Sequence, residues 1–418
     1  MSSYLQTKYR LFIYGLINLF VIVSVNSLSD LPTTVGNWES KAKLLASFQM
    51  PVDNFYPPGG AILLIPFLWF KSNFDLAVFF YFALSSIIYY LICSRVIKNS
   101  RYFYVALLGF TFNPYLLWLV NSSQDLVFEL FLILSAFALL LAGKHFLAYL
   151  PFYLLCLTRP QYWPSFLIMP LMATYLNFKF RRVEVLSKKL IAIPFIFLLM
   201  TLSINQIVFK TPAVAGEAGM TAHFGHNKFW YLSMPKFDSD VFLSTGGNMD
   251  TAKLLSTSDR FNQIKDDEFR AALINISESP KSLFLNTLQK VDTYFFAVQK
   301  NPQLSGQFYL SADQKSIVIG QNRDSWTLIF GSWIFFIQRS LLLIFSIAAL
   351  TLVVVFKQLR KALLVHPVSY FCLPYIFGSI AAVVYSTETR LKIVSELLLI
   401  PLIIFIFDIF KNQRSELN

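Results

Sequence analysis

Long apolar runs separated by short polar connectors dominate the pattern of this 418-residue chain. Several of the runs approach the roughly 20 apolar residues that a helix needs to cross about 30 Å of hydrocarbon. The pattern predicts about ten membrane-spanning helices, at 11–27, 76–94, 102–120, 126–143, 146–158, 162–178, 190–209, 335–356, 367–385 and 393–410. The expected fold is therefore an all-α polytopic membrane protein.

Two longer polar stretches interrupt this pattern. The first, 28–75, contains the apolar run 61–70, which is too short to cross alone and is expected as a helix at the membrane surface or dipping into it. The second, 210–330, has the length of a small domain. The chain thus divides into an N-terminal membrane core (1–209), a mostly helical insertion (210–330) and C-terminal transmembrane helices (331–418).

The insertion carries its own periodicity. Apolar residues recur at helical spacing over 258–276, and Pro280 precedes a second helical pattern over 281–300. Its apolar face and its lysines predict an interfacial helix. The alternation over 307–320 predicts a short β-hairpin.

Composition agrees with a membrane protein, since 56% of the residues are hydrophobic and 14% are charged. With the N-terminus inside, the inner connectors hold about 16 of the 35 Lys and Arg but only three acids, Glu184, Asp408 and Glu416. This asymmetry accounts for the formal charge of +12 and predicts cytoplasmic termini with any chemistry on the outer face. Bases scattered over short loops make no groove-tracking patch, so nucleic acid is excluded as a partner.

Cysteine and histidine give no metal site. Cys93, Cys156 and Cys372 all lie in apolar runs, where a thiol behaves as a small hydrophobe. His223 and His226 form the one close pair of histidines, and no third ligand accompanies them. No cofactor is predicted, and nothing in the sequence supports a divalent cation.

Four features, in order, resemble the GT-C superfamily of integral-membrane glycosyltransferases, including its mannosyltransferase and aminoarabinose-transferase types. The first outer loop runs through an acidic stretch and a short helix to Tyr56-Pro57-Pro58. An outer turn follows, with Asn113-Pro114 and then Asp125, and the amphipathic segment 272–296 precedes the last spans. Glu388-Thr389-Arg390 opens the final span.

The resemblance implies transfer of a sugar from a polyprenyl-phosphate donor in the bilayer to a glycan, lipid or protein acceptor. The reaction would take place on the periplasmic face of a bacterial inner membrane, with inversion. An acid in the first outer loop would be the base, and Asp30, Glu39 and Asp53 are the alternatives. Asn37 stands near where an Asp is expected.

The same resemblance implies phosphate or substrate contacts for a further set of residues, since a guanidinium fork matches phosphate oxygens. These residues are Arg390, Glu388, Arg159, Asp125, Lys41 and Tyr56. A favourable helix N-terminal charge is the alternative for Asp125, and a structural turn is the alternative for Tyr56.

Two other classes stay open. A transporter, flippase or polymerase of lipid-linked glycans would need charged residues within its spans, and Glu129 and Glu396 are the clearest of the few present. A catalytically inactive scaffold of the same fold would account for Asn37.

Overall fold

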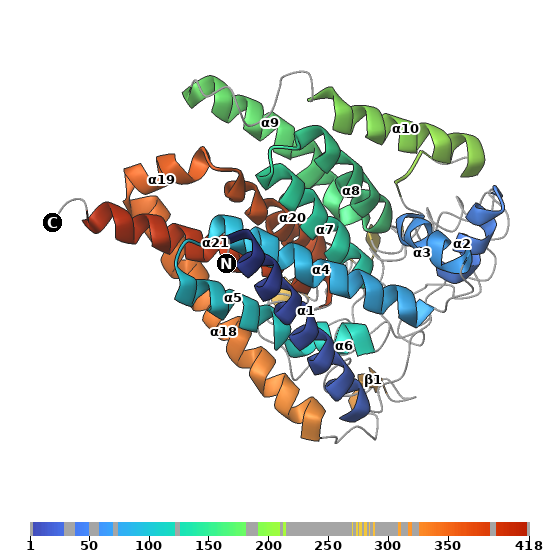
Figure 1. Ribbon diagram of the computed structural model, residues 1–418. Coiled ribbons are helices and arrows are strands. Elements are labelled where there is room, and N and C mark those ends of the chain that lie inside the picture. The colour runs from blue at the N-terminus through green and yellow to red at the C-terminus, as the bar shows by residue number, and fades with distance from the viewer. Residues whose placement is uncertain are drawn as a thin grey trace.

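The computed structural model describes most of the predicted membrane domain. The described residues are 3–28, 38–49, 58–69, 74–121, 126–180, 191–209, 212–214, 308–310, 317–319, 326–384 and 390–415, with isolated positions between 270 and 288. They form a bundle of helices in which α19 and the C-terminus lie at one end and α2 and α3 at the other (Figure 1).

The N-terminal part of the bundle contains eleven of the described elements. They are α1 (Ser3–Leu28), α2 (Trp38–Ala46), α3 (Gly59–Trp69), α4 (Phe74–Val96), α5 (Ser100–Thr111), α6 (Pro114–Asn121), α7 (Leu126–Leu141), α8 (His145–Thr158), the 3₁₀ turn η1 (Pro160–Tyr162), α9 (Trp163–Phe180) and α10 (Ala192–Phe209). The C-terminal part contains α18 (Trp326–Val355), α19 (Lys357–Leu364), η3 (Pro367–Phe371), α20 (Cys372–Val384) and α21 (Arg390–Ser415).

The predicted fold class is confirmed at the level of apolar helices. Three described helical segments are long and apolar enough to cross a membrane: Phe74–Val96, Ala192–Phe209 and Ile337–Val355. A fourth crossing is possible by length and composition if Lys357–Leu364 and Pro367–Ala381, which meet at 83°, form one broken span. Shorter apolar helices include Leu126–Leu141 and His145–Thr158. The number of ten crossings stays a prediction.

The predicted span 102–120 is broken in the structure. Its first half, α5, ends at Thr111, and its second half, α6, begins at Pro114, which has no N–H to donate to the preceding turn. The side chain of Asn113 accepts a hydrogen bond from Leu116 N at 3.1 Å and so caps α6. The Phe112 carbonyl at the break accepts a hydrogen bond from Gln338 of α18 at 3.3 Å.

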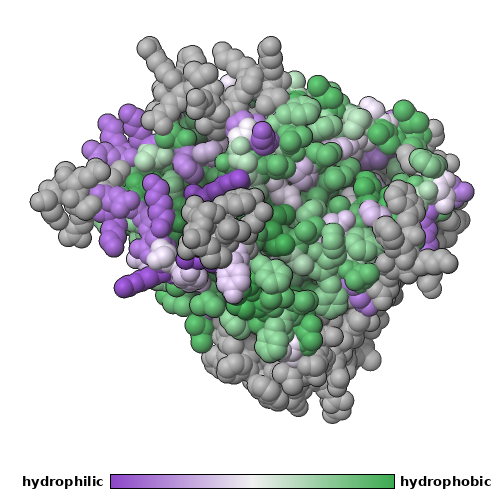
Figure 2. Space-filling view, in the orientation of Figure 1, coloured by the Kyte–Doolittle hydropathy of each residue, from purple (hydrophilic) through white to green (hydrophobic). Residues whose placement is uncertain are grey.

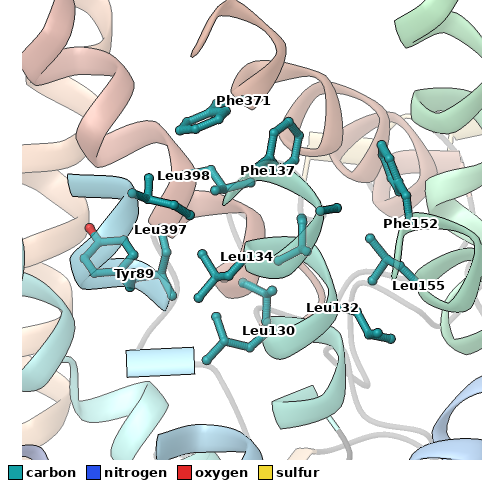
Figure 3. Close-up of a cluster of buried hydrophobic side chains, with 14 of the residues drawn as sticks. Tyr89, Leu130, Leu132, Leu134, Phe137, Phe152, Leu155, Phe371, Leu397 and Leu398 are labelled. Atoms are coloured by element: carbon teal, nitrogen blue, oxygen red, sulfur yellow. The ribbon is translucent and has the colours of Figure 1, made fainter. Parts of the chain in front are cut away.

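The core is centred on α7, which is apolar on every side and packs extensively against α4 and α8. Figure 3 shows its Leu134 and Phe137 beside Leu397 of α21 and Phe371 of η3. The Phe137 and Phe371 rings meet edge to face at 4.8 Å. Helices from both ends of the sequence therefore share one core.

The short run 61–70 lies in α3, which packs against α2, α4 and α8 at one end of the bundle, and its place at the membrane surface stays a prediction. Ala61 and Leu64 are buried. The backbone of α3 lies so close to α8 that a Cβ on Gly59 would sit 2.6 Å from the Leu154 carbonyl oxygen. The ring of Trp38 in α2 packs over Gly60 at 3.2 Å from its expected Cβ position. Both short helices of the first outer loop are thus fixed to the membrane core.

The predicted hairpin of the insertion is confirmed. Strands β1 (Phe308–Leu310) and β2 (Ile317–Ile319) pair antiparallel, with Phe308 opposite Ile319. The isolated described positions from Arg270 to Leu288 are helical, in agreement with the predicted helices, whose ends lie outside the described residues.

Hydrophilic side chains gather at the end of the bundle that holds α19, and hydrophobic ones cover its middle (Figure 2). This end carries Lys357, Arg360 and Lys361, which the sequence places on the inner side. That this end faces the cytoplasm stays a prediction.

Candidate functional site

A buried cluster of three polar side chains lies where α7, α8 and η1 meet. The Tyr162 hydroxyl donates a hydrogen bond to Glu129 Oε1. Arg159 Nε lies 3.4 Å from Glu129 Oε2. The side chain of Glu129 is 0% exposed and that of Arg159 is 16% exposed. We call Glu129, Arg159 and Tyr162 the outer cluster, since the predicted orientation places it on the periplasmic side.

The local sequence explains how the outer cluster forms. Arg159 precedes Pro160, and a residue before proline is restricted to extended conformations. Arg159 adopts φ −140° and ψ 101°, so α8 ends at Thr158 and the chain turns there. The 3₁₀ turn that follows brings Tyr162 back toward α7. Glu129 lies in the first turn of α7, where the helix dipole favours a negative charge.

Burying these charged side chains would destabilise the folded protein if they did not contact one another. A carboxylate and a guanidinium that leave water lose several kcal/mol of hydration, which close pairing and hydrogen bonds offset. The pair with Arg159 and the bond from Tyr162 supply such contacts to both Glu129 oxygens. Ionisable groups at such positions in a membrane protein are functional candidates by default.

The helix α2, which carries two predicted site residues, has an inward and an outward face. Lys41 is 6% exposed and lies with Trp38 and Ala42 on the buried face, where α2 packs against α3. Glu39 lies on the outward face and forms an ion pair with Lys43 at 2.8 Å. The α2–α3 pair in turn packs against α8 through α3, near the α8 end that carries the outer cluster.

The structure therefore describes three of the predicted site residues. Arg159 is in the outer cluster, Lys41 is buried on α2 and Glu39 is paired on the surface of α2. Arg390 is the first residue of α21, but its side chain lies outside the described residues. Asp30, Asp53, Tyr56, Asp125 and Glu388 also lie outside them, so their convergence with Arg159 stays a prediction.

A second buried acid–arginine pair joins two helices that are far apart in sequence. Arg339 Nε of α18 lies 3.8 Å from Glu396 Oε1 of α21, and both side chains are about 95% buried, with exposures of 5% and 6%. This pair lines a cavity of about 370 Å³. We call it the cavity pair.

The sequence alone drew attention to the acids of the outer cluster and of the cavity pair, but not to all of their partners. Glu129 and Glu396 stood out as acids inside apolar runs, but only as support for a transporter. Arg339, within the run 335–356, and Tyr162 were missed as polar partners. A search for basic and hydroxyl side chains in the other apolar runs would have flagged both as candidates, because a buried charge needs a partner, but it would not have shown which acid each one meets.

The described residues include no group of three or more His, Cys, Asp or Glu that could hold a metal ion. The three cysteines are free thiols, with Cys93 and Cys156 buried. No family model matches the chain, and no curated protein or solved structure matches it. The likeness to GT-C enzymes thus depends on the order of the sequence motifs.

Proposed function

We propose that the protein is a GT-C-like membrane glycosyltransferase that acts at the outer face of the bilayer. It would move a sugar from a polyprenyl-phosphate donor to a glycan, lipid or protein acceptor. The observation that carries the proposal is the outer cluster: a largely enclosed arginine paired with Glu129, which Tyr162 holds in turn, at the end of a helix that packs against α3 of the first outer loop.

The role of the outer cluster is to hold a cation in place. Glu129 contacts Nε of Arg159, the guanidinium nitrogen closest to the Arg159 backbone. This contact fixes the direction of the Arg159 side chain. A fixed guanidinium is the group best suited to recognise phosphate, because its planar fork matches two phosphate oxygens. In the proposed enzyme, Arg159 and Arg390 bind the donor phosphate, with Lys41 contributing positive charge, and Glu129 and Tyr162 are positioning residues.

The proposed chemistry requires a carboxylate opposite these cations. Asp30, Glu39 or Asp53 takes the proton of the acceptor hydroxyl as the acceptor oxygen attacks the anomeric carbon. The bond from that carbon to the phosphate oxygen breaks, and polyprenyl phosphate leaves with the electron pair. Cations that stabilise the leaving phosphate lower the barrier, and a single displacement inverts the anomeric centre.

The test is turnover by the purified full-length protein in lipid nanodiscs with radiolabelled polyprenyl-phosphate sugars. Asp30→Asn and Glu39→Gln separate the two main base candidates, and the base variant should lose activity by about a hundredfold or more. Lys43→Gln is the matched control for Glu39→Gln, because it breaks the same surface pair without removing the acid. Full activity in both acid variants removes Asp30 and Glu39 as the base and leaves Asp53 as the remaining candidate.

The role of Arg159 is tested by Arg159→Lys, which keeps the charge but removes the fork. We expect a lower kcat with intact folding, since the lysine cannot reproduce the planar two-point contact. Absence of turnover by the wild-type protein with a panel of donors contradicts the enzyme proposal.

One observation favours the alternative of a transporter or flippase for lipid-linked glycans. The two buried acid–arginine pairs are the kind of intramembrane charges that mark substrate paths, and one pair lines a cavity. A flippase moves a fluorescent lipid-linked glycan across a liposome membrane without changing its mass. An enzyme changes the mass of donor and acceptor, so the two functions give different readouts. A scaffold gives neither.

A further inference from the structure

The cavity beside Arg339 lies mainly between three helices of the C-terminal part of the bundle, and Leu363 of α19 and Ser369 of η3 also line it. Its walls are α18 and α20, and α21 lies behind them with Leu399, Leu402 and Ile403 buried. Leu350 of α18 and Ile376 of α20 also line the cavity, yet they are 65% and 46% exposed. The cavity therefore opens sideways between α18 and α20, toward the surface that faces lipid in a membrane.

The length of the cavity fits one hydrocarbon chain. Its lining runs from Glu396 to Ile406 on α21 and from Arg339 to Val353 on α18, which is about 15 Å and about 21 Å at 1.5 Å per residue. One leaflet of a bilayer contributes about 15 Å of hydrocarbon. The lining is almost wholly apolar below the cavity pair, with Leu342, Ala349 and Val353 on α18. A single acyl chain would lie along the helices, whereas a long polyprenyl chain exceeds this length.

The polar end of the cavity carries both signs of charge. Arg339 and Glu396 line it together, and Tyr375 of α20 lies among the same lining residues. Arg339 is four residues inside the predicted span 335–356, and Glu396 is three residues inside the predicted span 393–410, so the pair lies near the same end of both spans. In the predicted orientation this end is the outer one. A headgroup with a phosphate and an ammonium group would complement the arginine and the glutamate.

We propose that this cavity binds one zwitterionic phospholipid of the outer leaflet, with an acyl chain between α18 and α20 and its headgroup at the cavity pair. The lipid enters sideways past Leu350 and Ile376 and fills the space that α18 and α20 leave in front of α21. This inference does not depend on glycosyl transfer, because the binding site and its occupant are separate from the outer cluster.

The test is native mass spectrometry of the full-length protein, delipidated in detergent and then offered three lipids at equal mole fraction. The lipids are a phosphatidylethanolamine, a phosphatidylglycerol and a polyprenyl phosphate. We expect one phosphatidylethanolamine to stay bound to the wild-type protein. Ala349→Trp places an indole in the cavity and should lower that occupancy by about tenfold or more, since excluding two methylene groups already does so.

Val354→Trp is the matched control, because Val354 lies on the same helix and is 62% exposed on its lipid-facing surface. It should retain the lipid. Where Ala349→Trp fails to fold, Ser346→Phe fills the same cavity from a half-buried position. The double variant Arg339→Gln/Glu396→Gln should bind the two phospholipids equally, since it removes both charges together.

Three results overturn the proposal. The wild-type protein retains no lipid, the cavity-filling and control variants retain the same amount, or the wild-type protein prefers phosphatidylglycerol or polyprenyl phosphate. None of these measurements uses a sugar donor, so their failure is distinct from failure of the proposed enzyme activity.

Discussion

The two buried acid–arginine pairs differ in the packing around them. In the outer cluster, Glu129 is fully buried. Its Oε2 faces Arg159, and its Oε1 accepts a hydrogen bond from the Tyr162 hydroxyl. All three side chains come from 34 consecutive residues, 129–162. The cavity pair joins α18 to α21, and its partners are 3.8 Å apart on the wall of a 370 Å³ cavity.

This difference suggests different tasks for the same pair of residue types. A charge enclosed by packed protein gives a fixed side chain, which is what recognition of a leaving phosphate requires. A charge on a cavity wall can be reached by a group that enters from the bilayer. We therefore propose a positioning role for the outer cluster and a binding role for the cavity pair, and the predictions below test that separation.

The largest expected effect comes from removing the acid of each pair. Glu129→Ala leaves Arg159, whose side chain is 16% exposed, without its carboxylate and Tyr162 without its acceptor, and we expect a loss of about 3–5 kcal/mol in the free energy of unfolding. Glu396→Ala should cost less, about 1–3 kcal/mol, because its ion pair with Arg339 is longer, at 3.8 Å against 3.4 Å, and lies on a cavity wall. Denaturant titration of both variants in one detergent measures the difference.

Glu129→Gln is the control for the first variant, since it keeps the shape and an acceptor for Tyr162. Double-mutant cycles of each acid with its arginine then isolate the two coupling energies. Equal coupling energies within about 0.5 kcal/mol would mean that the two pairs have the same environment, against the comparison drawn above.

The next effect concerns how tightly the chain is packed around two glycines, Gly59 near the outer cluster and Gly378 in α20. A Cβ on Gly59 would meet the Leu154 carbonyl oxygen at 2.6 Å and the Leu157 carbonyl carbon at 2.7 Å, and neither backbone atom can move freely. We expect Gly59→Ala to destabilise the protein by about 1–3 kcal/mol. Gly378 in α20 has nothing within 4 Å of its Cβ position, so Gly378→Ala should stabilise its helix by up to about 1 kcal/mol.

Thermal unfolding of both alanine variants beside the wild type gives the measurement. Loss in Gly59→Ala together with gain in Gly378→Ala supports tight packing near the outer cluster and looser packing near the cavity. A loss of similar size in both variants contradicts that contrast.

A smaller effect is expected at the inner end of the cavity region. His366, in the turn between α19 and η3, accepts a hydrogen bond from Val368 N on Nδ1 at 3.2 Å, and its ring centroid lies 4.4 Å from that of Phe405. Burial, and then the positive charge of Lys98, lower the pKa of His366 below its usual value of about 6.5.

The direction of the pH effect follows from that lowered pKa. Neutral His366 stabilises the folded state above pH 6.5 or so, and this stability is lost as the pH falls through the lower folded-state pKa. His366→Asn keeps an acceptor for Val368 N and should remove this pH dependence. Melting curves between about pH 7.5 and 5 test it, and parallel curves for the two proteins contradict it.

Much of the fold followed from periodicity, because apolar runs near 20 residues and the alternation at 307–320 are local signals. The break at Phe112 was missed because apolar residues continue on both sides of it, although Asn113-Pro114 marks a helix start. The partners of Glu129 and Glu396 were also missed. They depend on which helices meet, and no local pattern in the sequence encodes that.

The smallest expected effect on stability belongs to Glu39, which is also a candidate for the largest effect on activity. Its carboxylate is 40% exposed and pairs with Lys43 one helical turn later, whose side chain is 64% exposed. Such pairs contribute about 0.3–0.5 kcal/mol, so Glu39→Gln and Lys43→Gln should unfold alike and close to the wild type. Any difference between them in sugar transfer then comes from chemistry rather than folding. If Glu39 is the base, Glu39→Gln loses turnover and Lys43→Gln keeps it. Equal turnover in the two variants would mean that Glu39 has no catalytic role, because only Glu39→Gln removes the carboxylate. Asp30 and Asp53 would then be the remaining candidates for the base.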